Sequence, residues 1–418
     1  MTTRQKVSGE TSCPINRLIL CALTVLTCSL LPTRGSAQTG EDAVAALVQM
    51  GFENVGWTED DEERVYVLEN SAYRLASVGI AHAIDVIQER GLPDKKPCRI
   101  IVLDNNVPQV SLSYEPIIGD SVPEPERADW SASYNVDRAW KKVRKAERRN
   151  SSLYKVDILV YPQLLYKNVI ITQIYQACVE ISPAVEVSLW KGSRLQLQVI
   201  FPAYNDGYYY ERENIRPGFL TLEQDFRLPH NIWLQATVGV FSRRTFGLDL
   251  QAKHTFRDER FSAEARIGVV GVGYFNDMKT FKYDGSQTIC YWSVGGDFYW
   301  PYFNTQFKLR VEEYLKHDVG VKFEMIRHFK YASICFYAEK CNKADSNGGF
   351  SFIVALPPYK YKRHGYIPRV NLSHGTGFVY NAGNQAYYYL MPYSSATDRN
   401  IMMKNQYNPQ FIESEIRN

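Results

Sequence analysis

The stretch that decides the fold reads Phe261-Ser262-Ala263-Glu264-Ala265-Arg266-Ile267-Gly268-Val269. Apolar side chains occupy every second position, and serine, glutamate, arginine and glycine stand between them. Because successive side chains of a β-strand point to opposite faces of the sheet, this period of two predicts a strand with one apolar and one polar face. The same alternation recurs in residues 195–201, 220–226, 232–240, 248–253, 306–312, 319–325 and 350–356.

Two architectures produce strands with two unlike faces. In a soluble antiparallel sandwich, one face packs on the core and the other meets water. In a membrane barrel, one face meets lipid, the other lines a polar interior, and aromatic side chains gather at the membrane edges. Here the polar face carries charges of both signs in strand after strand, and tyrosine or tryptophan clusters at strand ends in residues 208–210, 299–302 and 359–361. Both features favour the barrel.

The predicted fold is therefore mainly β: a single antiparallel transmembrane β-barrel of about twelve strands over residues 154–357. The strands are expected near residues 155–164, 179–190, 193–202, 218–228, 231–241, 245–256, 260–271, 288–300, 305–315, 319–329, 331–340 and 348–357. An even number suits closure of a bacterial barrel. At this size side chains fill much of the interior, so an open pore does not follow from the strand count.

The polar face supplies the candidate interior residues. The charged side chains expected to face the lumen are Asp249, Lys253, Glu264, Arg266, Lys308, Arg310, Glu312, Lys322 and Glu324. Two carboxylates among them could serve glycoside chemistry if they stood about 5–9 Å apart. Ion pairs between neighbouring strands are the favoured interpretation, because opposite charges that face each other across strands stabilise a sheet.

The sequence gives little support for an enzyme. Its seven histidines are scattered without metal-ligand spacing, and the α/β unit of residues 38–115 has no nucleophile–base pair and no phosphate loop. We therefore expect no catalytic residues, no metal and no cofactor. One loop has the aromatic and hydrogen-bonding groups of a glycan contact, although an aromatic girdle explains it equally well. Its residues are Asn205, Asp206, Tyr208, Tyr209 and Tyr210.

The first 37 residues are typical of a secretory signal peptide. Basic residues precede an apolar stretch over residues 18–31, and the small residues Gly35, Ser36 and Ala37 follow it. Cleavage there removes four basic residues and one acidic residue, so the formal net charge falls from +3 to zero. A neutral chain of this kind is not expected to bind nucleic acid.

Residues 38–115 predict a small two-layer α/β domain, which we expect to lie in the periplasm. Helices are expected over 41–50 and 75–90, and strands over 55–57, 64–68, 99–103 and 109–114. Such a unit is more often a docking module than an enzyme.

A linker with a basic helix follows over residues 116–153. Its basic residues are Arg138, Lys141, Lys142, Arg144, Lys145, Arg148 and Arg149, within a helix expected over 137–150. They could dock an anionic surface, either lipid head groups or an acidic glycan. A solvated helix at a domain junction is the simpler explanation, and we favour it.

Residues 358–418 read as a tail rich in tyrosine and asparagine, with residues 349–356 as the candidate closing strand. Five cysteines remain after the signal peptide: Cys98, Cys178, Cys290, Cys335 and Cys341. An odd, scattered set is not a disulfide framework. Cys335 and Cys341 could meet across a bend, and whether they form a disulfide is open from the sequence.

Several motifs resemble the YjbH-type outer-membrane exopolysaccharide proteins over about residues 41–360. They are Gly51-Phe-Glu-Asn-Val55, Tyr66-Val-Leu-Glu-Asn70, Tyr73-Arg74, Val311-Glu-Glu-Tyr-Leu-Lys-His-Asp318-Val-Gly320, Arg327-His-Phe329 and Gly348-Gly-Phe-Ser-Phe-Ile-Val-Ala-Leu-Pro357. The resemblance implies a barrel in the outer membrane of a Gram-negative bacterium that acts in exopolysaccharide or capsule assembly or export. It carries no catalytic residues.

The expected partners are outer-membrane lipid, an exopolysaccharide chain, and periplasmic or outer-membrane export proteins. Two alternatives remain open. One is an envelope scaffold barrel that docks other proteins through its α/β domain, and the more distant one is a secreted, soluble glycan-binding sandwich.

Overall fold

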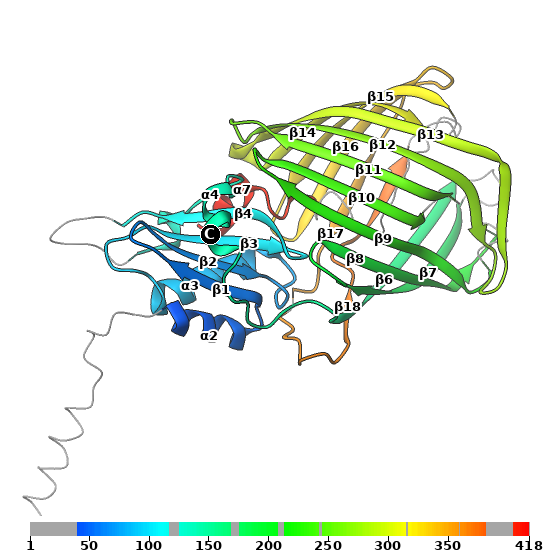
Figure 1. Ribbon diagram of the computed structural model, residues 1–418. Helices are drawn as coiled ribbons and strands as arrows, with labels where there is room; N and C mark the ends of the chain where they lie inside the picture. Colours follow the sequence, from blue (N-terminus) through cyan, green and yellow to red (C-terminus); the bar gives the residue numbers. More distant parts are fainter. Residues whose placement is uncertain are drawn as a thin grey trace, which may run out of the picture. The chain divides into compact units, whose positions relative to one another are not determined.

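The computed structural model describes residues 40–116, 125–168, 175–207, 213–241, 245–314, 317–358, 360–381 and 404–417. The predicted signal peptide lies outside these residues. The described chain is mainly β, with one five-stranded and one fourteen-stranded sheet (Figure 1). No helix among the described residues is both long and apolar enough to cross a membrane.

The five-stranded sheet has the order β1-β2-β3-β4-β5. Its strands are β1 Glu53–Glu59, β2 Arg64–Glu69, β3 Cys98–Asp104, β4 Val107–Tyr114 and β5 Ser131–Ser133. The helices of this domain are α2 Gly40–Met50, α3 Ala76–Arg90, α4 Asp137–Val143, α7 Pro409–Ile416 and the short 3₁₀ turn η1 Arg127–Asp129. All neighbouring strands are antiparallel except β2 and β3, which are parallel and are connected through α3, as a parallel pair requires.

Both faces of this sheet are covered, so the domain has three layers. The helices within residues 38–115 lie on one face, and the third layer comes from α4, in the segment predicted as a linker. Helices α2, α3 and α7 share one core with alternate strand residues, and Ile412 of α7 is fully buried in it. On the other face, Val136, Ala139 and Val143 of the α4 segment pack on β2 and β3. The consecutive apolar residues of β2 are the sequence signature of a strand covered on both faces.

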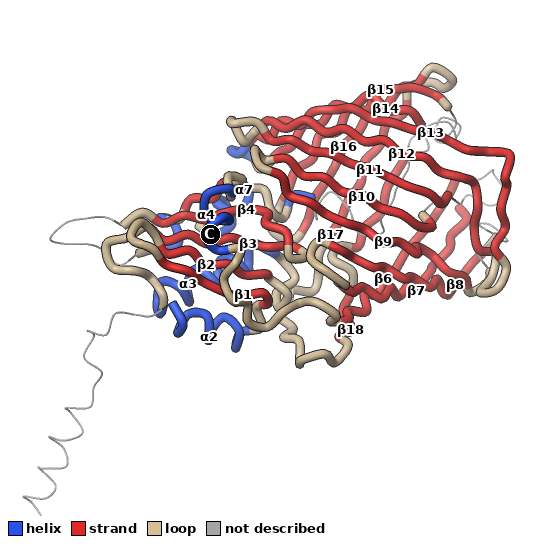
Figure 2. Tube along the Cα trace, in the orientation of Figure 1, coloured by secondary structure: helices blue, strands red, loops and turns tan. Residues whose placement is uncertain are grey.

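The fourteen-stranded sheet runs in the order β18-β6-β7-β8-β9-β10-β11-β12-β13-β14-β15-β16-β17-β19 (Figure 2). Its strands are β6 Val156–Asn168, β7 Tyr175–Val187, β8 Ser193–Asn205, β9 Arg216–Leu228, β10 Ile232–Val240, β11 Thr245–Thr255, β12 Phe261–Phe275, β13 Phe281–Trp300, β14 Thr305–Tyr314, β15 Asp318–His328, β16 Ala332–Cys341, β17 Asn347–Val354, β18 Arg369–Leu372 and β19 Thr376–Asn381. A short 3₁₀ turn, η3 Pro301–Phe303, connects β13 to β14.

Each of the twelve predicted strands overlaps one of β6 to β17, but the sheet also contains β18 and β19. Both come from the segment predicted as a tail, so a count of twelve is too low and β17 is not the last strand. β18 pairs in parallel with β6, and β19 pairs antiparallel with β17. Only residues 373–375 separate them, so consecutive segments of the chain hold the two ends of the sheet.

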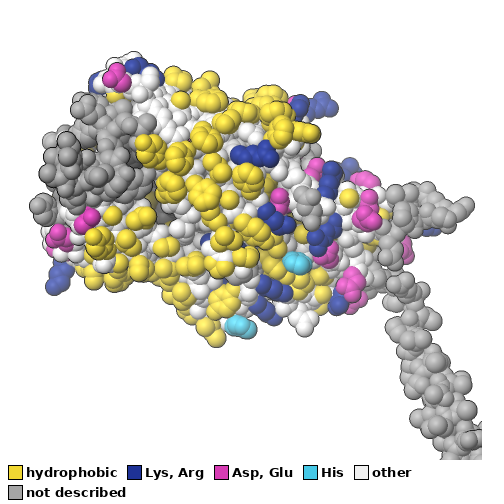
Figure 3. All heavy atoms as spheres, turned by 180° about the vertical axis from the view of Figure 1, so that it is seen from behind, with side chains coloured by type: hydrophobic (Ala, Val, Ile, Leu, Met, Phe, Trp, Pro, Cys, Tyr) yellow, Lys and Arg dark blue, Asp and Glu magenta, His cyan; other side chains and the backbone are white. Residues whose placement is uncertain are grey.

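The polarity of the large sheet is reversed relative to a soluble protein. On β12, Phe261, Ile267 and Val269 are 43%, 58% and 46% exposed, whereas Ser262 between them is buried. Neighbouring strands repeat this pattern, with Asp249, Asp297 and other charged side chains buried on the opposite face. Figure 3 shows hydrophobic side chains spread over a broad area of the surface, with a few basic side chains among them.

Within the described residues, none of the five cysteines after the predicted signal peptide forms a disulfide. Cys335 and Cys341 lie on the same strand, β16, and six residues of extended chain separate them by about 20 Å. The bend that would bring them together is absent from this part of the described chain, so a disulfide between them is ruled out.

Candidate functional site

The predicted lumen-facing charges form a network of ion pairs on the buried face of β11 to β16. Asp249 is completely buried, and its Oδ1 accepts a hydrogen bond from Nε of Arg266 on the next strand at 2.7 Å. The other distances between charged atoms are 3.6 Å for Lys253–Asp297, 3.0 Å for Lys308–Asp297, 3.5 Å for Lys308–Glu264, 3.6 Å for Arg310–Glu264, 2.6 Å for Arg310–Glu324, 3.5 Å for Lys322–Glu324 and 3.9 Å for Lys322–Glu339. The ion pairs expected from the sequence are therefore present, although Glu312 has no ion pair among these contacts.

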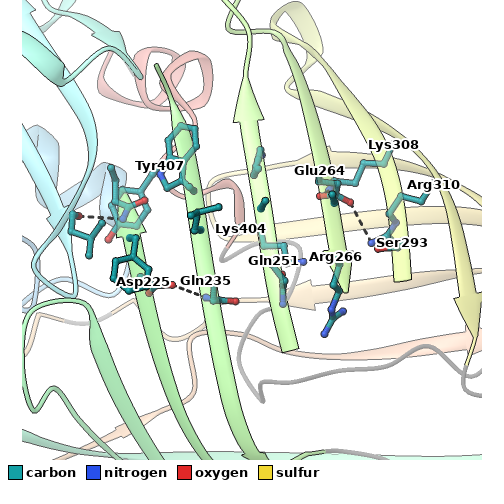
Figure 4. A pocket seen from close by; sticks show the side chains of 18 of the residues that line it. Asp225, Gln235, Gln251, Glu264, Arg266, Ser293, Lys308, Arg310, Lys404 and Tyr407 are labelled. Carbon is teal, nitrogen blue, oxygen red and sulfur yellow. Dashed lines mark hydrogen bonds and ion pairs between the residues drawn. The ribbon is translucent and has the colours of Figure 1, made fainter. Parts of the chain in front are cut away.

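A cavity of about 240 Å³ lies beside this network (Figure 4). The buried face of the large sheet lines most of it, with the amides of Gln235 and Gln251 and the carboxylate of Glu264. The small domain contributes Tyr134, and the segment before α7 contributes Lys404 and Tyr407. The cavity thus joins groups from three distant parts of the chain.

An aromatic pair connects the small domain to this cavity. The ring of Tyr134 meets the ring of Trp233 edge-on, with the centroids 5.1 Å apart, and the guanidinium of Arg227 lies 3.5 Å from the centroid of Trp233. Glu259, in the turn between β11 and β12, accepts hydrogen bonds from the Ser133 hydroxyl at 2.6 Å and from the Tyr134 backbone N–H at 2.9 Å. These contacts fix the position of Tyr134 at the cavity wall.

The small domain contacts one end of the large sheet along most of its width. The hydroxyl of Ser188 donates to the Asn105 side chain at 2.6 Å, and the backbone N–H of His230 donates to Asp137 at 3.0 Å. Asn304 donates to the hydroxyl of Ser414 on α7 at 2.9 Å. These partners follow β7, β9 and β13, and alternate hairpins of an antiparallel sheet lie at the same edge. The small domain therefore covers the end of the sheet at which these hairpins lie.

A second cavity, of about 150 Å³, lies where the small domain meets β6 and β18. Asp157 on β6 pairs with Arg363 at 2.5 Å and with Arg369 of β18 at 2.7 Å. Arg369 also donates to the carbonyl oxygens of Ser71 and Tyr361. One arginine thus connects the small domain to the end strand of the large sheet.

Glu69 at the end of β2 also lines the second cavity. Its carboxylate accepts a hydrogen bond from the Asn54 side chain at 2.7 Å and from the Asn106 backbone N–H at 3.0 Å. Burial, reinforced by the neighbouring charge of Asp104, raises the pKa of Glu69 to about 7. The folded domain therefore holds this proton more tightly than an unfolded chain does.

We expect the small domain to lose stability as the pH rises from about 4 to about 7, between the pKa of Glu69 in the unfolded and in the folded chain. Below about pH 4 the carboxyl of Glu69 is protonated in both states; between there and pH 7 only the folded state keeps the proton, so the free energy of unfolding should fall by about 1–3 kcal/mol. Glu69→Gln keeps the shape without the charge and should remove this part of the pH dependence. Amide hydrogen exchange of β2 to β4 at pH 5 and pH 8 measures the effect, and the exposed Glu115→Gln is the control. Equal pH dependence in Glu69→Gln and the unmodified chain would contradict it.

The predicted glycan-contact loop is only partly described. Asn205 ends β8, and Asp206 accepts a hydrogen bond from the Ala177 backbone N–H at 2.6 Å, which ties this end of β8 to β7. Tyr208, Tyr209 and Tyr210 lie outside the described residues.

The predicted basic helix is shorter than expected, because α4 ends at Val143. Arg138 pairs with Glu62 at 2.6 Å, and Lys142 pairs with Asp60, Glu62 and Glu63 at 2.6 to 2.9 Å. Arg148 stacks over Trp140, and Arg149 pairs with Glu41. Lys141, Arg144 and Lys145 are exposed. Most of the basic side chains thus serve contacts within the small domain.

The sequence singled out only the charged strand residues of the cavity, and it missed Tyr134, Trp233, Lys404 and Tyr407 among others. Trp233 shares the inward parity of Gln235 on β10, so strict alternation could have identified it. Tyr134, Lys404 and Tyr407 follow from no local pattern, because their segments reach the cavity only through the packing of β5 and α7. Within the described residues, no group of three or more His, Cys, Asp or Glu side chains could hold a metal ion.

Comparisons with known proteins assign no family. No protein-family model matches the chain. No curated protein matches it. A solved structure that it resembles is OmpTdeltaL8, a loop L8 deletion mutant of OmpT, described as an outer membrane protein of Vibrio cholerae. The TM-score is 0.26 at 10% sequence identity, and the match covers 48% of this chain and 87% of that chain.

This neighbour is described only as an outer membrane protein, and a match with a TM-score of 0.26 supplies no catalytic residue and no substrate. The prediction that this chain is not an enzyme is not carried further.

Proposed function

We propose that this chain is an outer-membrane β-barrel protein of a Gram-negative envelope that serves the assembly or export of an exopolysaccharide or capsule. The observation that carries the membrane part is the reversed polarity of the large sheet. Leu250, Ile267 and Leu309 are each more than 40% exposed on consecutive or nearby strands, while the charged network lies on the buried face. An apolar area of this extent costs free energy in water and is stabilised against lipid.

The arrangement of β18 and β19 supports closure of the sheet into a barrel. β18 pairs with the edge strand β6, and β19 pairs with β17 at the other edge. Only residues 373–375 separate β18 from β19, so the two edges of the sheet are paired with neighbouring segments of the chain. A membrane-spanning sheet must leave no unpaired edge in the hydrocarbon, and closure satisfies this requirement. The small domain at one edge then belongs in the periplasm, where a preceding signal peptide would deliver it.

The polysaccharide part rests on the cavity together with the resemblance to the YjbH-type proteins. A sugar site combines an aromatic ring with amide, hydroxyl and charged groups that fix the hydroxyls of the ligand. Trp233, Gln235, Gln251 and Ser293 supply such groups around the larger cavity. The small domain beside it is placed to contact a chain that enters from the periplasm.

Membrane location and export can be tested separately. The chain should fractionate with outer membranes, and unheated protein should migrate differently from boiled protein in detergent gels, because a closed barrel resists detergent until heated. Deletion should reduce surface polysaccharide by at least tenfold, and expression of the unmodified chain should restore it. A detergent-free soluble monomer would contradict the membrane part, and unchanged polysaccharide would contradict the export part.

A scaffold barrel is a second candidate function. The observation that favours it is the exposed group Lys141, Arg144 and Lys145, which makes no ion pair with a described residue and offers a basic surface to an acidic partner. Under this function, deletion would leave surface polysaccharide unchanged and would destabilise other envelope proteins.

A further inference from the structure

Lys404 differs from the other cations around the larger cavity. Six basic and five acidic side chains line this cavity. The basic side chains on the strands have carboxylate partners within 4 Å, as Arg266 has in Asp249 and Lys253 has in Asp297. Lys404 forms no ion pair with any described residue. Among the basic side chains that line this cavity, it is the one without a carboxylate of the described residues within 4 Å.

The surroundings of Lys404 are unfavourable for a cation. The side chain of Lys404 is exposed within the cavity. The surrounding protein groups nevertheless remove water from its ammonium group and, together with the nearby charges of Lys308, Arg310 and Arg266, lower its pKa to about 8. Glu264 acts in the opposite direction, but its carboxylate is shared between Lys308 at 3.5 Å and Arg310 at 3.6 Å. An anion placed beside Lys404 would relieve this repulsion without breaking an existing ion pair.

The chain fixes Lys404 in this position through α7. Asn408 caps that helix by accepting hydrogen bonds from the backbone N–H groups of Gln410 and Phe411 at 3.0 and 3.3 Å. Ile412 then buries the helix in the core of the small domain. Lys404 precedes the helix by only a few residues, and its exposed side chain lines the cavity close to Gln235 and Gln251 (Figure 4).

The remaining cavity groups suit a sugar more than a small inorganic anion. The amide of Gln235 donates to Asp225 at 2.8 Å, which orients its carbonyl oxygen as a hydrogen-bond acceptor. Trp233 and Tyr291 present apolar rings, and Ser293 presents a hydroxyl. A sugar ring has the apolar faces and hydroxyl groups that match these side chains, whereas phosphate or sulfate would use only the cations.

We infer that this cavity binds an acidic sugar residue and that the ammonium group of Lys404 holds its carboxylate. The inference rests on the proposed function and narrows it to a polysaccharide that carries uronic acids. The amides and Trp233 hold the sugar ring.

The test uses the full chain in detergent micelles and two probes of equal length, trigalacturonate and its fully methylated ester. Titration calorimetry should give at least tenfold tighter binding of the acid than of the uncharged ester. Lys404→Gln should weaken binding of the acid about tenfold and leave binding of the ester unchanged, and Lys404→Arg should retain most of the affinity. Lys340→Gln, an exposed lysine on β16, is the matched control and should change neither.

Two outcomes overturn the inference: equal affinity of the unmodified chain for acid and ester, or unchanged acid binding in Lys404→Gln. Heat-modifiable migration of each variant establishes that it is folded before titration. A chain that fractionates with outer membranes and supports polysaccharide export, but does not distinguish acid from ester, overturns this inference alone. Failure of the membrane fractionation or the deletion test overturns the proposed function instead.

Discussion

Ile267→Arg should lower the free energy of unfolding of this protein in phospholipid bilayers by about 2–4 kcal/mol. Ile267 lies near the middle of β12, and its side chain is 58% exposed on the apolar face. If that face meets lipid, a guanidinium at mid-depth must be transferred from water into hydrocarbon. If it met water instead, the same substitution at an exposed position would change stability by less than about 0.5 kcal/mol.

Phe261→Arg on the same strand is the matched control. Phe261 begins β12, is 43% exposed and points to the same face as Ile267. At the edge of a bilayer the cost of arginine is only about 0–1 kcal/mol, because the side chain reaches the interface. Urea titrations of both variants in vesicles measure the difference. Equal effects of the two substitutions would be inconsistent with a lipid-facing sheet.

The second large effect is expected at Asp249. Its carboxylate is completely buried, accepts hydrogen bonds from Arg266 at 2.7 Å and from Gln251 at 2.7 Å, and accepts a third from the Tyr291 hydroxyl. Asp249→Ala leaves the guanidinium of Arg266 without its carboxylate in a largely buried site. Such removal of one partner of a buried ion pair costs about 3–5 kcal/mol, so the free energy of unfolding should fall by that amount.

Two control variants distinguish the causes of this loss of stability: one removes the charge of Asp249 but keeps its shape, and the other removes an ion pair that is exposed instead of buried. Asp249→Asn keeps a hydrogen-bond acceptor without the charge. Its free energy of unfolding should lie between that of the unmodified chain and that of the alanine variant. Asp258→Ala removes an exposed partner of Arg260, where an ion pair contributes less than about 1 kcal/mol. A loss below about 1 kcal/mol for Asp249→Ala would mean that the inner face is well hydrated and that Arg266 does not need its partner.

Short-range patterns predict the regular elements of this protein closely. Strand alternation follows from the geometry of the extended chain, so every predicted strand of residues 154–357 overlaps one of β6 to β17. The elements of the small domain are also placed within a few residues: α3, for example, covers Ala76–Arg90 where a helix over 75–90 is expected. Gly91 caps the end of that helix.

The choice of ion-pair partners follows the strand register only in part: Lys308 pairs with Asp297, which stands opposite it, but other pairs are diagonal. Lys253 stands opposite Glu264 in the register of β11 and β12, yet its nearest carboxylate is that of Asp297 on β13. Lys308 stands opposite Glu324, which pairs with Arg310 instead at 2.6 Å. Long charged side chains reach diagonal neighbours, and the twist and tilt of the strands decide which diagonal is short.

The sequence by itself determined that long strands of this chain have one apolar and one charged face, because that property depends only on alternation along each strand. The tertiary structure decided which side of the sheet is exposed, that β18 and β19 hold its two ends, and that Lys404 enters a cavity walled by β9 to β14. These features depend on contacts between segments more than 100 residues apart, such as the hydrogen bond from Asn304 to Ser414. No local pattern encodes such contacts, since they form only when complementary surfaces of the folded elements meet.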